Sequence, residues 1–282
     1  MKRILITGAN SYIGTSFESY IKQWPEDYQV DTIDMIDGSW REKSFAGYDA
    51  VFHVAGIAHM KETRKNAPLY YSVNCDLAVE TARKSKADGV KQFVFLSSMS
   101  VYGMETGVIT KETQPAPKTH YGKSKLEAEK GMSALVDENY SVAILRPPMV
   151  YGKGCKGNFK LLEKLSLCLP IFPYIENQRS MLYIENLTEF VRLIIDNKEK
   201  GLFWPQNAEY SNTSLLVKNI AEVHKKRVRL FCGFMPALKL ASSFIKKVGK
   251  AFGSLIYDAS MSVYKLDYRI YSLSDSIMRT VD

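Results

Sequence analysis

The sequence predicts an α/β fold, a doubly wound parallel sheet of the Rossmann type with a smaller carboxyl-terminal lobe. Three observations predict it. Strand-like apolar segments alternate with helix-like segments over the first 150 residues, and a glycine-bearing turn joins the first strand to the first helix. After Arg146-Pro147-Pro148 this alternation becomes less regular. We therefore divide the 282-residue chain into a sheet domain, residues 1–150, and a second lobe, residues 151–282.

Near-continuous apolar runs such as Phe93-Val94-Phe95-Leu96 indicate strands that are covered on both faces. The stretch from Met35 to Ala50 is too short for the usual helix, strand and helix, so we expect the third strand of the usual sheet to be missing or vestigial. The helix at residues 185–197 is expected to pack back on the sheet. The predicted strands are 2–7, 29–35, 49–56, 91–97 and 141–145, and the other predicted helices are 13–24, 70–89 and 121–138.

The composition is that of an ordinary folded protein, with 46% hydrophobic and 24% charged residues. The apolar runs are short, so we expect no transmembrane helix, and no signal-peptide pattern follows Met1. Four widely spaced cysteines fit reduced thiols in a cytoplasmic protein. The net charge of +8 comes from scattered residues, which argues against a nucleic-acid partner.

The first turn, from Gly8 to Gly14, lies where a dinucleotide fold binds pyrophosphate at a helix N-terminus. Ser11 replaces the central glycine of the Gly-x-x-Gly-x-x-Gly pattern. Its hydroxyl can still donate to phosphate, but its Cβ limits how closely the phosphate approaches. The cofactor-binding residues predicted in this turn are Gly8, Asn10, Ser11, Tyr12, Ile13 and Gly14.

Asp34 ends the second predicted strand, 20 residues after Gly14, where a carboxylate can accept hydrogen bonds from both ribose hydroxyls. Its charge would repel a 2′-phosphate, so NAD is favoured over NADP. Asp31 and Asp37 are the alternatives to Asp34 for this role. Further along the chain, Ala55-Gly56 would pass under the nicotinamide side of the cofactor. Asn74 would turn its amide toward the cofactor or the backbone, or else have a capping or surface role.

Tyr121 and Lys125 stand four residues apart, which places both side chains on one face of a helix. An ammonium beside a phenol lowers the tyrosine pKa from its usual value of about 10. The pair is therefore expected to act as a base toward an alcohol or sugar hydroxyl. Ser97-Ser98 lies about 23 residues earlier, at the carboxyl end of an apolar strand, which is the edge of an α/β sheet where ligands bind.

Five motifs in order carry a family resemblance from Arg3 to about Leu187. The chain resembles an extended short-chain dehydrogenase/reductase of the NAD-dependent epimerase/dehydratase family, which includes UDP-glucose 4-epimerases. It is most similar to a compact branch found with bacterial surface-polysaccharide enzymes. The motifs are Thr-Gly-x-x-x-x-Ile-Gly, His53-x-Ala55-Gly56, Ser-Ser-x-x-Val-Tyr-Gly, Tyr121-x-x-x-Lys125 and Arg146-Pro147-Pro148-x-Val150-Tyr151-Gly152.

The resemblance implies a role for each matching residue. Ser98 hydrogen-bonds the reacting sugar oxygen, Tyr121 transfers the proton, and Lys125 holds the nicotinamide ribose and favours the Tyr121 phenolate. Pro148 joins the cofactor site. The resemblance also implies a UDP-sugar substrate, whose binding residues would be Ser98, Ser100, Tyr121, Asn158 and Arg179.

The leading interpretation is a C4 epimerase of UDP-hexoses or UDP-N-acetylhexosamines with NAD as cofactor. The alternatives are an NAD(P)H-dependent reductase of a UDP-4-keto-6-deoxy sugar, which needs the same residues, and a non-catalytic nucleotide sensor. Dehydration is disfavoured, because Met99 and Ser100 stand where the related dehydratases place an Asp-Glu pair.

Family members are often dimers, and residues 77–87 with 126–135 could supply the face of a homodimer. The basic segment at 234–256 either packs on the lobe or contacts a membrane peripherally. His59 and His120 flank the predicted site, and with four histidines and no close acidic partners we expect no metal site.

Overall fold

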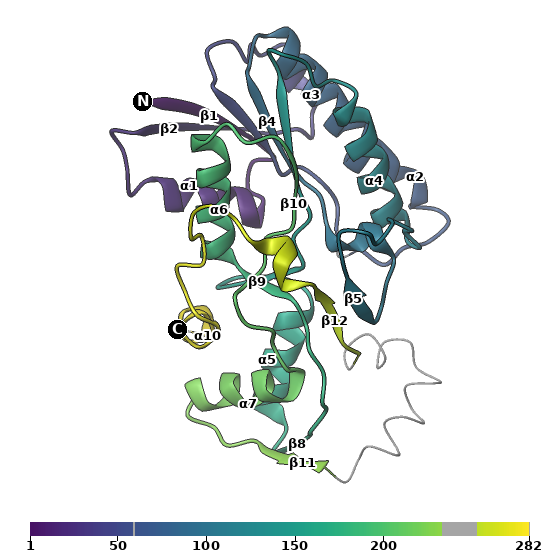
Figure 1. Ribbon diagram of the computed structural model, residues 1–282, viewed down its shortest axis with the longest axis vertical. Coiled ribbons are helices and arrows are strands. Elements are labelled where there is room, and N and C mark those ends of the chain that lie inside the picture. Colours follow the sequence, from purple (N-terminus) through teal and green to yellow (C-terminus); the bar gives the residue numbers. More distant parts are fainter. Residues whose placement is uncertain (59, 233–252, 282) are drawn as a thin grey trace.

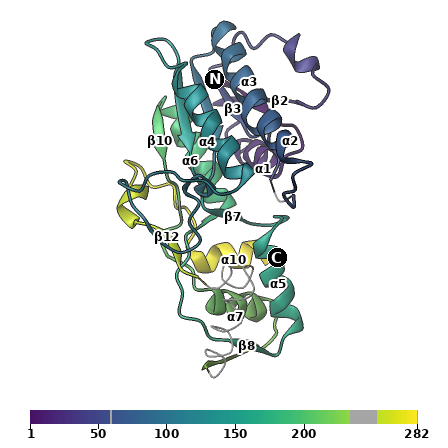
Figure 2. The same ribbon diagram turned by 90° about the vertical axis from the view of Figure 1, so that its right-hand side faces the viewer.

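A computed structural model describes residues 1–58, 60–232 and 253–281 of the chain. Figure 1 shows a sheet with helices on both sides, above a second lobe that contains α5, α7, β8 and β11. Figure 2 shows the same division after a quarter turn, with β8 at the far end of the lobe. The segment at 234–256 falls largely outside the described residues, as does His59.

The main sheet has six parallel strands in the order β10-β6-β4-β3-β1-β2. It ends at β2, and residues 34–49, all of which are described, contain only the 3-10 turn η1, Ser39–Arg41. The expectation that the third strand is missing is thereby confirmed. The strands are β1 Lys2–Thr7, β2 Tyr28–Ile33, β3 Ala50–His53, β4 Gln92–Leu96, β6 Ser141–Leu145 and β10 Gly201–Phe203.

Alternate residues of the strands supply two separate cores, one on each face of the sheet. Ile4, Ile6 and Phe52 pack with α1 (Tyr12–Ile21) and α6 (Ile184–Asp196). Leu5 and Val51 pack with α3 (Leu77–Ala87) and α4 (His120–Ser133) on the other face. This burial on both faces accounts for the continuous apolar runs in the sequence.

The long helix predicted at 70–89 is divided into three pieces. The first is α2, Ala67–Tyr71, the second is a π-helical turn, η2, Ser72–Asp76, and the third is α3. Polar residues at the turn, with Asn74 fully buried among them, mark the interruption. Helical periodicity in the sequence does not reveal a single π turn, because the flanking segments keep their apolar faces.

The second lobe begins after β7, Met149–Tyr151, which pairs with β9, Met181–Tyr183. Its helices are α5 Asn158–Cys168, α7 Thr213–Val223 and α10 Leu273–Val281. A parallel pair within the lobe joins β8 Ile171–Pro173 to β11 Arg229–Phe231, and another joins β5 Gly107–Ile109 of the first domain to β12 Leu255–Tyr257. Among the described residues, none of the helices combines the length and the hydropathy that a membrane span requires.

A buried ion pair between Glu129 of α4 and Arg146, just after β6, joins the helix to the sheet. The Arg146 Nε donates to Glu129 Oε1 at 3.0 Å, and the second guanidinium nitrogen donates to Oε2 at 2.6 Å. Ser97, after β4, also donates to Glu129. On its far side Arg146 donates to the hydroxyl of Tyr102, which Trp204 contacts as well. One salt bridge therefore fixes α4 against the ends of two strands.

We predict that breaking this pair destabilises the protein strongly. Arg146→Met leaves the Glu129 carboxylate buried without its partner, which should lower the free energy of unfolding by about 3–5 kcal/mol. The double variant Glu129→Met, Arg146→Met should lose much less than the sum of the two single variants. Urea unfolding at neutral pH measures each free energy.

The exposed pair of Arg41 and Glu80 provides the control, since Arg41→Met should change stability little. Additive effects of the two single changes at Glu129 and Arg146 would contradict the prediction.

Candidate active site

The turn after β1 brings the chain close to the end of β3. Gly8 has φ +108°, and its N–H donates to the Ile33 carbonyl at 3.0 Å. A Cβ at this position would lie 2.7 Å from the backbone nitrogen of Ala55. Glycine is required here both for its conformation and for its size. The turn therefore lies against the ends of both neighbouring strands.

Ser11 is the N-cap of α1, and its hydroxyl oxygen accepts a hydrogen bond from the N–H of Gly14 at 3.2 Å. A Cβ on Gly14 would meet this oxygen at 2.6 Å. Ser11 thus stabilises the start of α1, where dinucleotide folds bind pyrophosphate. Its hydroxyl proton remains available for donation to a phosphate oxygen.

The carboxylate of Asp34 lies just beyond β2, beside the turn, and is exposed. Its Oδ1 accepts from the N–H of Ile36 at 2.8 Å. A tight turn, the start of α1 and an exposed carboxylate at the next strand end together fit an adenine dinucleotide, so the residues present are suited to NAD. Asp31, in contrast, accepts from the hydroxyl of Tyr48, and Asp37 caps a local turn at Ser39.

Gly56, Asn74 and Lys125 converge beyond the end of β3. A Cβ on Gly56 would lie 2.9 Å from Asn74 Oδ1 and 3.4 Å from Lys125 Nζ. The Asn74 amide pairs with both backbone groups of Ile57, accepting at 2.8 Å and donating at 3.1 Å, and its nitrogen also approaches the hydroxyl of Ser124. Of the alternatives for Asn74, the structure shows the one directed at the backbone, and the side chain holds the loop after Gly56 against α4.

The Lys125 ammonium is buried at the end of β4. It donates to the Leu96 carbonyl at 2.8 Å and lies 4.6 Å from the centre of the Phe95 ring. Burial lowers the pKa of Lys125 to about 8, while the carboxylate of Glu129 one turn later acts in the opposite direction. The lysine therefore keeps its proton at neutral pH, although burial weakens its hold on that proton.

Ser98 and Tyr121 meet across the gap between β4 and α4. Burial raises the pKa of Tyr121, a side-chain hydrogen bond with Ser98 lowers it, and the nearby Tyr70 raises it. The net shift is upward, opposite to the lowering expected from Lys125. The difference arises because the Lys125 ammonium is directed to the Leu96 carbonyl and because desolvation of the phenol dominates. Ser98 Oγ also accepts from the Ser100 N–H at 3.1 Å.

Glu62 holds the start of the helix that carries Tyr121, a role that the sequence did not indicate. Its two carboxylate oxygens accept from the N–H groups of His120 and Tyr121, each at 3.0 Å. The N-cap residue Thr119 accepts from Gly122. A carboxylate at a helix N-terminus also meets the positive end of the helix dipole. No spacing rule connects residue 62 with residue 120, because helices and strands separate them in the sequence and only the fold brings the loop that carries Glu62 to the start of α4. The ring of His120 itself faces Tyr71, 3.3 Å from its hydroxyl.

The remaining predicted residues lie at different places. Pro148 is buried between β6 and β7. Asn158 is exposed as the first residue of α5, and the Arg179 guanidinium donates to the Gly253 carbonyl at 2.9 Å. Both residues belong to the second lobe, whereas the contacts of Gly56 with Lys125 and of Ser98 with Tyr121 lie at the ends of the main-sheet strands.

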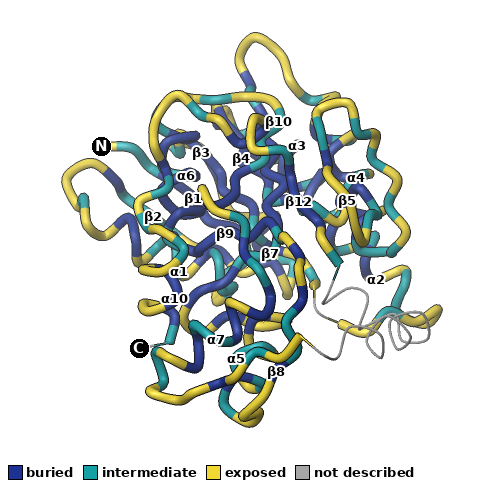
Figure 3. The backbone as a smooth tube through the Cα atoms, turned by 60° about the horizontal axis from the view of Figure 1, so that its bottom comes forward, coloured by how far each residue is buried: buried dark blue, intermediate teal, exposed yellow. Residues whose placement is uncertain are grey.

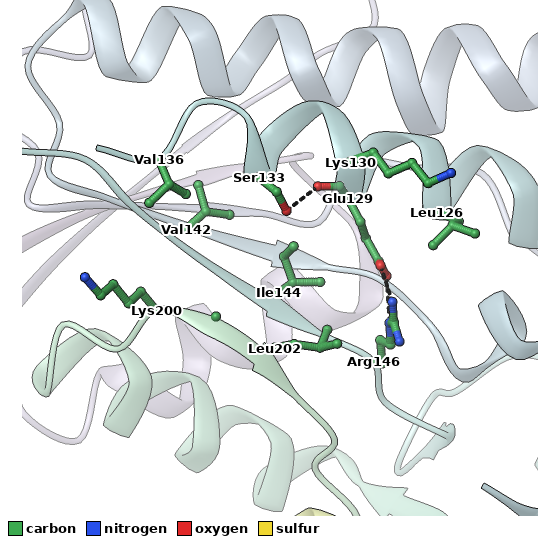
Figure 4. Close-up of a pocket in the computed structure, with 11 residues that line it drawn as sticks. Leu126, Glu129, Lys130, Ser133, Val136, Val142, Ile144, Arg146, Lys200 and Leu202 are labelled. Carbon is green, nitrogen blue, oxygen red and sulfur yellow. Dashed lines mark hydrogen bonds and ion pairs between the residues drawn. The ribbon is translucent and has the colours of Figure 1, made fainter. Parts of the chain in front are cut away.

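A pocket of about 680 Å³ lies behind α4, over β6 and β10 (Figure 4). Leu126, Ile144 and Leu202 contribute to its apolar walls, and the Glu129–Arg146 pair forms one end. It contains neither Ser98 nor Tyr121, so it is separate from the proton-transfer residues. Among the described residues, moreover, no group of three His, Cys, Asp or Glu side chains is placed to hold a metal ion.

Comparison with known proteins agrees with this geometry. Residues 4–203 match the model of the NAD dependent epimerase/dehydratase family. A UDP-glucose 4-epimerase of Vibrio cholerae is 31% identical over 78% of this chain and 75% of its own length. An N-acetyl-alpha-D-glucosaminyl-diphospho-ditrans,octacis-undecaprenol 4-epimerase of Escherichia coli O157:H7 is 27% identical over 70% of this chain and 64% of its own length.

Solved structures show the same fold at low identity. A dTDP-4-dehydrorhamnose reductase of Clostridium acetobutylicum superposes with a TM-score of 0.77 at 19% identity, covering 99% of this chain and 98% of its own. A UDP-glucuronic acid 4-epimerase of Bacillus cereus in complex with NAD has a TM-score of 0.74 at 19% identity, covering 98% of this chain and 96% of its own. The doubly wound fold predicted from the sequence is therefore confirmed.

We predict that Lys125→Met leaves the protein at least as stable at neutral pH. The lowered pKa corresponds to a cost of about 3 kcal/mol for keeping the ammonium buried, which the methionine avoids. The lysine penalty is full below pH 8 and fades as the pH rises toward 10.5, because there the unfolded chain still holds the proton that the native state has released. The parent should therefore gain stability relative to the variant over that interval.

Urea midpoints of parent and variant at pH 7 and pH 9.5 measure the difference. Lys130→Met, at an exposed position of the same helix, should give a difference that does not change with pH. A pH-independent difference for Lys125→Met as well would show that the ammonium is not buried.

Proposed function

The chain belongs to the NAD dependent epimerase/dehydratase family, and we propose that it inverts C4 of a UDP-hexose or UDP-N-acetylhexosamine. The observation that carries the proposal is the contact of Ser98 with Tyr121, on the same helix whose Lys125 ammonium reaches the end of β4. The 4-epimerases among the relatives support the reaction type. Each feature lies at the carboxyl edge of the parallel strands.

The chain's own residues would bind the sugar and move its proton. Ser98 would hold O4 of the sugar, and the Tyr121 oxygen would take the proton from that hydroxyl. NAD, held by the turn from Gly8 to Gly14, would supply reversible hydride acceptance at C4. Tyr121 would then give the proton back to O4, so that protons and hydride balance over the cycle.

The electrostatics favour a proton transfer that depends on bound ligands. Burial keeps the Tyr121 phenol protonated in the free protein, since its pKa is raised. Lys125, one turn later on α4, would be the cation that favours the phenolate, and it remains charged at neutral pH because its pKa is about 8. We propose that Lys125 turns from the Leu96 carbonyl to the nicotinamide ribose and the phenol when the site is filled.

The second lobe would hold the UDP part of the substrate. We propose Asn158 and Arg179 as donors to the diphosphate, with Ser100 beside Ser98 at the sugar. Arg179 would have to exchange or share its Gly253 partner. We also propose a cytoplasmic homodimer that pairs through α3 and α4.

The reaction is tested with the purified protein and without added cofactor. Bound nucleotide is released by denaturation and identified, and UDP-glucose and UDP-N-acetylglucosamine are incubated in parallel and followed by NMR. We expect NAD in the released fraction and inversion at C4. Tyr121→Phe should lower the rate by about 10²–10⁴-fold with NAD still bound, and Ser72→Ala, an exposed site on η2, should not.

An empty site, with NAD(P)H oxidised only when a 4-keto sugar is added, would replace the epimerase with the reductase. Full activity of Tyr121→Phe would remove the phenol from the mechanism.

A further inference from the structure

The outer surface of the second lobe, opposite α7, carries basic and large apolar side chains side by side. The strands β8 and β11 turn Phe172 and Leu230 toward α7, and the helix α5 does the same with Leu165. Each of these elements therefore turns its outer side away from α7. Figure 3 shows exposed stretches around α5 and β8, at the end of the lobe remote from the main sheet.

The outer side of α5 is cationic. Lys160 and Lys164 are exposed one turn apart, and with Lys156, Gly157 and Leu161 they line a shallow hollow of about 250 Å³. The acidic residue of this helix, Glu163, faces His224 instead, with 3.6 Å between Oε1 and Nε2. The hollow thus presents three ammonium groups around a half-exposed leucine.

The outer side of β8–β11 continues this pattern. Ile171 of β8 lies opposite Arg229 of β11 in the parallel register, and both are exposed. The Lys226 ammonium donates to the Leu167 carbonyl at 2.9 Å, which ties a second basic segment to the end of α5. The exposed fractions of three large apolar residues here are 56% for Leu161, 37% for Leu169 and 52% for Ile171. Exposed apolar side chains bordered by polar or charged groups are a feature of interaction surfaces.

We propose that this outer surface, formed by Lys156, Lys160, Leu161, Lys164, Leu169, Ile171, Lys226 and Arg229, binds the surface of an anionic lipid bilayer. Charge complementarity selects that occupant, because ammonium and guanidinium groups attract lipid phosphates while leucine and isoleucine enter the boundary of the acyl chains. Both kinds of group occur on this face, whereas a soluble anion would use only the cations. The proposal does not depend on the reaction at Tyr121.

Co-sedimentation of the full-length protein with vesicles tests the surface. We expect binding to phosphatidylglycerol mixed with phosphatidylcholine, little binding to phosphatidylcholine alone, and weakening by salt. The triple variant Lys160→Gln, Lys164→Gln, Arg229→Gln should lower the partition coefficient about a hundredfold, at about fivefold for each charge. Ile171→Ser should lower the partition coefficient severalfold without changing the charge of the surface.

The matched control removes the same charge elsewhere, at the exposed residues Lys43, Lys91 and Lys111, each replaced by Gln. It should bind nearly as well as the parent. Circular dichroism and the thermal midpoint confirm that each variant is folded. Equal losses in both triple variants would mean that net charge alone causes binding. Undiminished binding of the first triple variant, or binding to a soluble acidic polymer but not to vesicles, would also overturn the proposal.

Discussion

The arrangement of the site depends on one buried ion pair, Glu129 with Arg146. Glu129 lies one helical turn after Lys125, and Arg146 follows directly from β6. Ser97 donates to the same carboxylate from the end of β4, next to Ser98. The relative position of the helix with Tyr121 and Lys125 and of the strand with Ser98 is therefore set by one carboxylate. Burying a charge pair brings little net stability, but it penalises misplacement severely, because any displacement leaves an unpaired charge in an apolar region.

A second cation, the Lys125 ammonium, is buried in the same region, and Glu129 compensates its charge only in part. The Lys125 pKa is lowered by burial and raised by Glu129, so the carboxylate that positions the helix also helps to keep the lysine charged. Stability and the proposed chemistry are thereby opposed at Lys125. Such opposition is usual at sites where a charged group must act away from water.

The sequence was sufficient to predict the sheet and its missing strand, because buried parallel strands are apolar throughout and the length from Met35 to Ala50 limits what can form there. It was also sufficient to indicate the turn at Gly8, where size and conformation both demand glycine. It was insufficient for Glu62, whose contact with the start of α4 depends on the course of a loop. The direction of the Tyr121 pKa shift was predicted wrongly, because spacing along a helix reveals a neighbouring charge but not the loss of water around the phenol.

The π turn at η2 shows how a local irregularity can serve the site. Each residue that a helix gains or loses rotates the residues after it by about 100° around the helix axis. A regular helix through residues 72–76 would therefore present the following residues on a different side. The extra residue lets Asn74 point inward while α3 keeps Ala78 and Ala82 against the sheet. Asn74 then fixes both backbone groups of Ile57 and contacts Ser124. Because Ser124 adjoins Lys125 and Ile57 adjoins Gly56, this one amide links the proposed nicotinamide side of the cofactor site to the helix that carries the proton-transfer pair. The irregular turn is therefore best explained by the position it gives to Asn74, in keeping with the frequent occurrence of π turns at functional sites.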